Sequence, residues 1–233
     1  MTPAASRTIK RVIDVVISLA LLVVVVPILA IVALTSLIMQ GRPVFYTSPR
    51  HVGKDRVVTI YKFRSMAKDA ASGAYRLRER FMDKGYLGIP MDCEVYTPLG
   101  RILERTQLVE LPQIFNVLLD GMSWVGNRAL PAENVEMLKQ FPGWEERFDS
   151  PCGLTGISQV VGKFNLDAEQ RIEVERLYSA VYQRGNVLKC DLLIVLATIR
   201  LILSDQSMPY EEGIALLESC LPASRESVEE SPK

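Results

Sequence analysis

The stretch that decides the fold is VVISLALLVVVVPILAIVALTSLIMQG, which runs without a charged residue from Val15 to Gly41. Leu, Val and Ile dominate it from Leu19 to Ile38. A run of roughly eighteen or more apolar residues is typical of a membrane segment. A cleaved signal peptide would have a shorter apolar core, of about 7–15 residues. The stretch therefore predicts a membrane anchor.

Pro27 lies in the middle of this anchor. A proline inside a helix removes a hydrogen bond and clashes with the preceding turn, so the helix bends or breaks there. Each arm beside it provides about 20 Å of helix at about 1.5 Å per residue, whereas the hydrocarbon core is about 30 Å thick. Two arrangements stay open: a full span, and a re-entrant hairpin over about residues 12–40 that is kinked at Pro27.

Basic residues flank the anchor on both sides, namely Arg7, Lys10 and Arg11 before it and Arg42, Arg50, Lys54 and Arg56 after it. Because basic flanks favour the cytoplasmic side, a hairpin that returns to the face it entered satisfies both flanks. We therefore favour the hairpin over the full span.

The amino-acid composition argues against several common kinds of binding and catalytic site. The chain has 27 basic and 27 acidic residues, so its bulk charge does not point to nucleic acid as a partner. The four cysteines lie far apart with no C-x-x-C pair, which argues against the usual zinc sites. A single histidine, His51, leaves little room for a Ser-His-Asp unit. We expect carboxylates, basic side chains and a metal to carry any reaction.

The remaining sequence predicts strands over 43–46 and 57–63, a loop and strand over 151–162, and helices over 67–84, 110–121, 133–140, 168–183 and 192–203. The last helix is apolar enough for the core or for a membrane surface. The predicted fold class is therefore α+β, with a re-entrant membrane hairpin in an anchor over residues 1–41. A small cytosolic α/β domain with interfacial helices follows over 42–204, and then an acidic, partly disordered tail over 205–233.

Three local features could bind an anion. Lys62 and Arg64 should share one face of a strand end, since side chains alternate, and such a pair can clamp a phosphate; a solvated basic edge fits equally well. Glu110 stands at a helix start that favours anions, although capping is the simpler interpretation. Arg128 follows a glycine-permitted bend at Gly126, where arginines are usually just exposed.

Taken together and in this order, the features resemble the bacterial sugar transferases of the monotopic polyprenyl-phosphate phosphoglycosyl transferase family. The resemblance spans about residues 8 to 200. It rests on Lys10-Arg11-x-x-Asp14, Pro27, Pro43-Val-Phe-Tyr46, Lys62-Phe-Arg-Ser-Met66, Glu110-Leu-Pro-Gln113-x-x-Asn116-Val-Leu118, Met122-Ser-x-Val-Gly126 and Gly153-Leu-Thr-Gly156-x-x-Gln159.

The resemblance implies an enzyme that transfers a sugar 1-phosphate from a nucleoside diphosphate sugar to polyprenyl phosphate, usually with Mg²⁺, and so initiates surface polysaccharide or glycoconjugate assembly. It implies a place in the bacterial inner (cytoplasmic) membrane, with the soluble domain on the cytoplasmic face. Membrane lipid and other glycan-assembly enzymes are the implied partners. In such enzymes an aspartate directly before the Glu-Leu-Pro-Gln motif attacks and holds the phosphosugar covalently.

The chain departs from this pattern around the implied active site. Val109 occupies the position of the attacking aspartate, and a valine has no lone pair with which to attack phosphorus. The usual basic pair before the motif is Glu104-Arg105, and the usual Gly-Asp before Met-Ser is inverted as Asp120-Gly121. The usual Pro-Arg-Pro after Val-Gly is Asn127-Arg128-Ala129.

Three hypotheses stay open. In the first, the chain is a transferase in which Glu110 or Asp120 attacks or binds metal, or in which transfer is direct. In the second, it is an inactive relative that acts as a membrane scaffold or substrate-binding regulator. In the third, Val109 is an introduced substitution in an ordinary enzyme. The candidate residues are Glu110 and Asp120 for catalysis, Glu110 for the metal, and Lys62, Arg64, Arg105 and Arg128 for phosphate or substrate.

Overall fold

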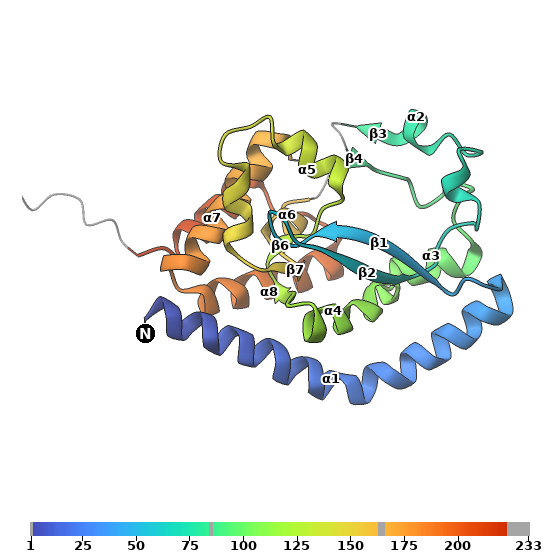
Figure 1. Cartoon of the computed structure of the whole chain (residues 1–233), viewed down its shortest axis with the longest axis horizontal. Coiled ribbons are helices and arrows are strands. Elements are labelled where there is room, and N and C mark those ends of the chain that lie inside the picture. The colour runs from blue at the N-terminus through green and yellow to red at the C-terminus, as the bar shows by residue number, and fades with distance from the viewer. Residues whose placement is uncertain (1, 84–85, 163–165, 223–233) are drawn as a thin grey trace, which may run out of the picture.

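The computed structural model describes residues 2–83, 86–162 and 166–222. It has mixed helix and sheet. One long N-terminal helix lies along one side of the remaining elements, which are called the body (Figure 1). The α-helices are α1 (Pro3–Gln40), α2 (Leu77–Phe81), α3 (Pro98–Arg105), α4 (Ile114–Leu119), α5 (Ala132–Leu138), α6 (Ile157–Val160), α7 (Ala168–Arg184), α8 (Val187–Ser204) and α9 (Tyr210–Glu218). Three 3-10 helices are η1 (Ala70–Ser72), η2 (Leu108–Gln113) and η3 (Trp144–Asp149).

Within the described ranges the strands form three small sheets. An antiparallel hairpin joins β1 (Phe45–His51) to β2 (Val57–Phe63), and a second, very short one joins β3 (Met82–Asp83) to β4 (Tyr86–Leu87). In the third sheet β7 (Cys152–Thr155) lies between β5 (Ser123–Val125) and β6 (Asn127–Arg128) and runs parallel to both. The strands predicted at 43–46 and 57–63 are thus confirmed, with the first one shifted and lengthened.

The apolar stretch forms a single helix, α1, in place of a hairpin with a sharp reversal. Thr2 caps its start, and Gly41 ends it with a φ of 67°, a conformation that glycine adopts without strain. Pro27 lies inside the helix, which bends in its middle while both arms stay against the same body (Figure 1). The bend agrees with the missing N–H of Pro27 and its clash with the preceding turn.

Lys10 fixes the first arm of α1 to the body. Its ammonium donates to Asp191 Oδ2 in α8 at 2.6 Å and to the Val125 carbonyl in β5 at 2.9 Å. Tyr178 of α7 completes the cluster, because its hydroxyl donates to the other Asp191 oxygen at 2.8 Å. Lys10 is almost fully buried, and four elements (α1, α7, α8 and β5) meet at this ion pair.

One turn further along α1, a second polar contact meets strand β5. Asp14 accepts from the Ser123 hydroxyl at 2.7 Å and from the Trp124 amide at 3.2 Å, and the indole of Trp124 donates to Ser18 at 3.0 Å. These side chains form a polar stripe on an otherwise apolar helix. The stripe faces the body, so the apolar sides face outward.

The second arm of α1 packs against the body through apolar side chains. Val32 joins a buried cluster with Phe63 of β2, Leu99 and Leu103 of α3, and Val109 of η2. The last turn is held from outside the helix, where Arg64 donates to the carbonyls of Gln40 at 2.7 Å and Gly41 at 3.0 Å. Both ends of α1 are therefore attached to the same body.

Helices α7, α8 and α9 enclose the largest apolar core, where Val174, Tyr178, Ile194 and Leu217 are fully buried. Leu217 belongs to α9, so part of the segment expected as a tail over 205–233 is a helix packed on the body. Residues 223–233 of that segment lie outside the described residues.

The single long helix expected over 67–84 is wrong. The chain there forms η1, α2 and strand β3, with a left-handed glycine at Gly73. Tyr75, Leu77 and Phe81 turn inward onto a small cluster around Val95. Burial of these side chains outweighs the helical preference of the charged residues between them.

Candidate functional site

One face of the β1–β2 hairpin carries the first part of the candidate site. The register pairs Tyr46 with Lys62 and Arg50 with Val58. Side chains two residues apart on a strand point to the same face, so Tyr46, Arg50 and Lys62 share a face. Ile60, which lies between Lys62 and Val58 on that face, is buried in a core cluster with residues of α4 and the third sheet. The face is therefore directed at the body.

Glu110 of η2 meets this face. Its carboxylate forms a salt bridge with the Lys62 ammonium, and both side chains are partly buried, with 30% and 24% of their surfaces exposed. The structure thus brings together two of the residues singled out in the sequence, from positions 48 residues apart.

Arg128 of β6 and Arg50 of β1 complete the cluster. Burial lowers the pKa of Arg50, the charge of Arg128 lowers it further, and Glu110 acts in the opposite direction. His51, at the end of β1, connects that strand to the segment that follows β6, since its amide donates to the Leu130 carbonyl at 2.8 Å. In the described part of the chain neither guanidinium has a hydrogen bond or salt bridge. Two neighbouring arginines whose guanidinium groups form no salt bridge are suited to an anion.

A buried ion pair supports Arg128 from behind. Arg147 donates to the Arg128 carbonyl at 2.7 Å and forms a salt bridge with Glu175 at 2.7 Å, and both charged side chains have no exposed surface. Asn127, the neighbour of Arg128, donates to the carbonyls of Arg147 and Glu175 at 2.8 and 2.9 Å. These contacts hold the short strand β6 and fix the position from which Arg128 reaches the cluster.

Other sequence candidates lie apart from the cluster. Arg64 follows the end of β2 and donates to the Pro43, Gln40 and Gly41 carbonyls, so its guanidinium caps α1. Asp120 ends α4 and accepts from Asn116 at 2.7 Å. It follows the end of α4, whereas Glu110 lies in η2, which precedes the start of that helix. Arg105 is exposed at the end of α3.

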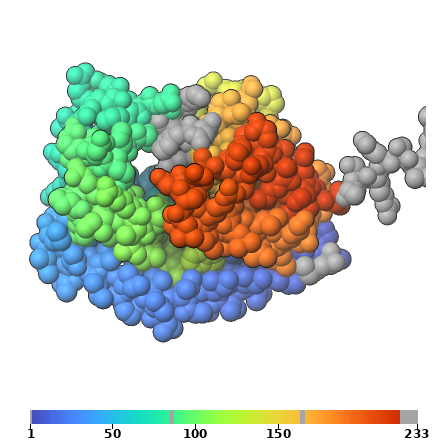
Figure 2. Space-filling model, turned by 180° about the vertical axis from the view of Figure 1, so that it is seen from behind, coloured from blue at the N-terminus to red at the C-terminus, as the bar shows by residue number. Residues whose placement is uncertain are grey.

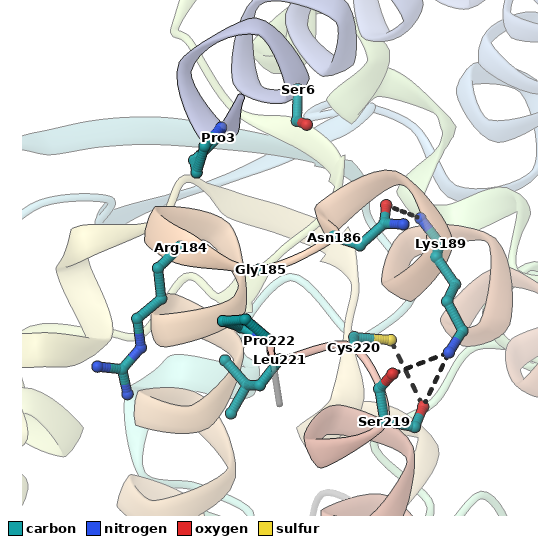
Figure 3. Close-up of a pocket in the computed structure, with 10 residues that line it drawn as sticks. All are labelled: Pro3, Ser6, Arg184, Gly185, Asn186, Lys189, Ser219, Cys220, Leu221 and Pro222. Atoms are coloured by element: carbon teal, nitrogen blue, oxygen red, sulfur yellow. Dashed lines mark hydrogen bonds between the residues drawn. The ribbon is translucent and has the colours of Figure 1, made fainter. Parts of the chain in front are cut away.

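A pocket of about 420 Å³ lies at another end of the molecule, between the start of α1 and the ends of α7 and α9 (Figure 3). Arg184 and Lys189 contribute its basic side chains. The ammonium of Lys189 donates to the Ser219 carbonyl at 2.8 Å, so it is already engaged. None of the candidate residues lines this pocket, and we assign it no role.

A broad apolar surface accompanies α1. Large exposed side chains cover its outer faces, and α4 and α8 add Phe115, Leu119, Leu192, Leu196 and Leu203, with Leu119 79% and Leu203 81% exposed. The space-filling view shows α1 along one whole edge of the molecule (Figure 2). In the described residues α1 is the one helix long and apolar enough to cross a membrane. Fold and site together define a membrane-associated protein with a cationic cluster on its polar body.

The comparisons agree with this class. The family model described as "Bacterial sugar transferase" matches residues 5–205, and the chain belongs to that family. It is 30% identical to a UDP-glucose:undecaprenyl-phosphate glucose-1-phosphate transferase of Klebsiella pneumoniae, over 82% of this chain and 39% of the relative.

Two further relatives extend the range of names. The chain is 31% identical to a UDP-N-acetylgalactosamine-undecaprenyl-phosphate N-acetylgalactosaminephosphotransferase of Aeromonas hydrophila, over 84% of this chain and 44% of the relative. It is 30% identical to the exopolysaccharide production protein PSS of Rhizobium leguminosarum bv. phaseoli, over 82% of this chain and 92% of the relative. The chain thus spans about two fifths of the longer relatives and nearly all of the Rhizobium protein.

Proposed function

We propose that this chain transfers a sugar 1-phosphate from a nucleoside diphosphate sugar to polyprenyl phosphate, and so initiates surface polysaccharide or glycoconjugate assembly. The observation that carries the proposal is the pair of partly buried arginines, Arg50 and Arg128, beside the Lys62–Glu110 salt bridge. Such a cluster neutralises charge on phosphate groups, and phosphoryl transfer depends mainly on positioning and charge neutralisation. The relatives' names supply UDP-sugars and undecaprenyl phosphate as the substrates to try first.

We also propose that α1 enters one leaflet of the bacterial inner membrane and leaves by the same, cytoplasmic face. Supporting this, Lys10 and Arg64 attach the two ends of the helix to one body. If α1 crossed the bilayer, one of its ends would lie on the opposite side. That end would have to detach from the body, which would break either the Lys10–Asp191 ion pair or the hydrogen bonds of Arg64. The basic flanks favour the cytoplasmic side for both ends. The lipid phosphate would then meet a soluble nucleotide sugar at the membrane surface.

Magnesium stays a proposal. In the described ranges no group of three or more His, Cys, Asp or Glu side chains is placed to hold a metal. Mg²⁺ commonly uses one or two protein carboxylates and completes its shell with water and substrate phosphates. Glu110 fits as a single such carboxylate, and Mg²⁺ bound there would neutralise charge on the diphosphate.

The direct test is release of nucleoside monophosphate. The full chain in polyprenyl-phosphate vesicles with Mg²⁺ and a panel of UDP-sugars should release UMP over many turnovers only when both lipid phosphate and nucleotide sugar are present. Binding of both substrates without release would instead support the scaffold or regulator hypothesis, which the relatives' names do not favour.

The membrane placement predicts where spin labels meet lipid. A label on Leu203→Cys, at the exposed end of α8, should collide mainly with oxygen, which concentrates in the hydrocarbon, because the apolar surface beside α1 lies in the membrane. A label on Leu87→Cys, on the β3–β4 arm, is the control and should collide mainly with a water-soluble nickel chelate. Equal access of the chelate to both labels would contradict the placement.

A further inference from the structure

The residue next to Glu110 provides no nucleophile. Val109 is 2% exposed and packs in the apolar cluster with Val32 of α1, Phe63 and Leu103. Its side chain therefore faces the core beneath the second arm of α1. A covalent intermediate needs a side chain with a lone pair available to attack, and position 109 has none.

Glu110 contributes a carboxylate to the cluster, and that carboxylate is already paired with Lys62. Among the described residues whose charges shift the pKa of Arg50, Glu110 is the carboxylate. It forms a salt bridge with Lys62 through Oε1, so one of its two oxygens already holds the ammonium. A carboxylate in this position is better suited to hold Lys62 in place than to attack.

The charges of the cluster suit two anions held together. Among the described residues that these contacts connect, three are cations (Arg50, Lys62 and Arg128) and one is a carboxylate (Glu110). In a covalent route the diphosphate and the lipid phosphate bind in turn. In a direct route both lie in the site at the same time, and the surplus of positive charge offsets their mutual repulsion.

We propose that the sugar phosphate passes directly from the nucleotide to the lipid, with Glu110 as a positioning residue for Lys62. This inference rests on the proposed function. An oxygen of the polyprenyl phosphate attacks the phosphorus that carries the sugar. The bond from that phosphorus to the bridging oxygen breaks, and the bridging oxygen leaves with the nucleoside monophosphate. The lipid becomes a sugar-bearing diphosphate, and the step needs no proton.

Isotope exchange separates the two routes. The full chain in vesicles without polyprenyl phosphate is incubated with Mg²⁺, a UDP-sugar and labelled UMP. A covalent route moves label into the UDP-sugar without lipid, because its first half-reaction reverses. Direct transfer should give no label above background there, and should give label once the lipid product is present, since the complete reaction reverses.

A second readout uses the same protein. After incubation with UDP-sugar labelled in the sugar and denaturation in acid, direct transfer predicts no protein-bound label. Label on the protein, or exchange without lipid, would overturn the inference while leaving the proposed function intact. Failure of the complete mixture to release UMP would instead remove the proposed function, and the inference with it.

Discussion

Replacing Lys10 with methionine is expected to lower the free energy of unfolding by about 3–5 kcal/mol, since the change leaves the buried Asp191 carboxylate without its cation. Lys10 contacts Asp191 at 2.6 Å and the Val125 carbonyl at 2.9 Å. Methionine preserves the length of the side chain but donates no hydrogen bond. Denaturant unfolding of the protein in detergent, followed by Trp fluorescence, measures the loss.

The deficit should depend on pH. Burial raises the pKa of Asp191, and the charge of Lys10 opposes that rise, so without Lys10 the pKa rises further. A carboxyl whose pKa is raised in the folded state lowers the stability of that state as the pH rises from its unfolded-state pKa to its folded-state pKa. The deficit of Lys10→Met should therefore shrink toward acidic pH. The double variant with Asp191→Asn should recover stability at neutral pH, and a small, pH-independent loss would contradict this role.

Replacing Arg128 with alanine is expected to lower kcat/KM for UMP release by about 10²–10³, the usual cost of one preorganised donor at a developing charge. Lys62 has no planar pair of donors, and Arg50 holds its own pair at a different position, on β1, so neither replaces the lost guanidinium. Arg128→Lys should not restore the rate, because an ammonium lacks that planar pair of donors. Steady-state kinetics in vesicles give the measurement.

Arg76→Ala is the matched control for Arg128. Arg76 is an exposed arginine that pairs with Glu79, and its loss should leave kcat/KM within about twofold, as exposed ion pairs contribute little. If Arg128→Ala behaved like Arg76→Ala while remaining folded, Arg128 would have no part in binding phosphate.

Much of the fold could be predicted because its strongest signals are local. Strand β2 has the bounds that its β-branched and aromatic residues predict, and α7 extends one residue beyond its prediction. The continuity of α1 through Pro27 could not be predicted, since contacts with the body hold both arms. The region over 67–84 failed for a related reason: its apolar residues bury against Val95, a contact that no local pattern records.

The candidate site was predicted only in part. Lys62 and Glu110, two of the residues singled out in the sequence, form a salt bridge. Arg50 was missed because Ser48 and Pro49 concealed the continuation of β1 to His51. Had that strand been extended, alternation would have placed Arg50 on the same face as Lys62. Arg64 was expected on the same face, yet β2 ends at Phe63 and the alternation stops with it.

The proposal that α1 enters and leaves the membrane by the same face is tested most directly by finding the side of the membrane on which each of its ends lies. Thr8→Cys introduces an exposed thiol near the start of α1, before its apolar stretch, and Asp55→Cys introduces one after the helix; the native cysteines are all buried. If both ends lie on the cytoplasmic face, we expect a membrane-impermeant thiol reagent to label both variants in inside-out vesicles and neither in intact spheroplasts. Labelling of the two positions from opposite sides would contradict the proposal.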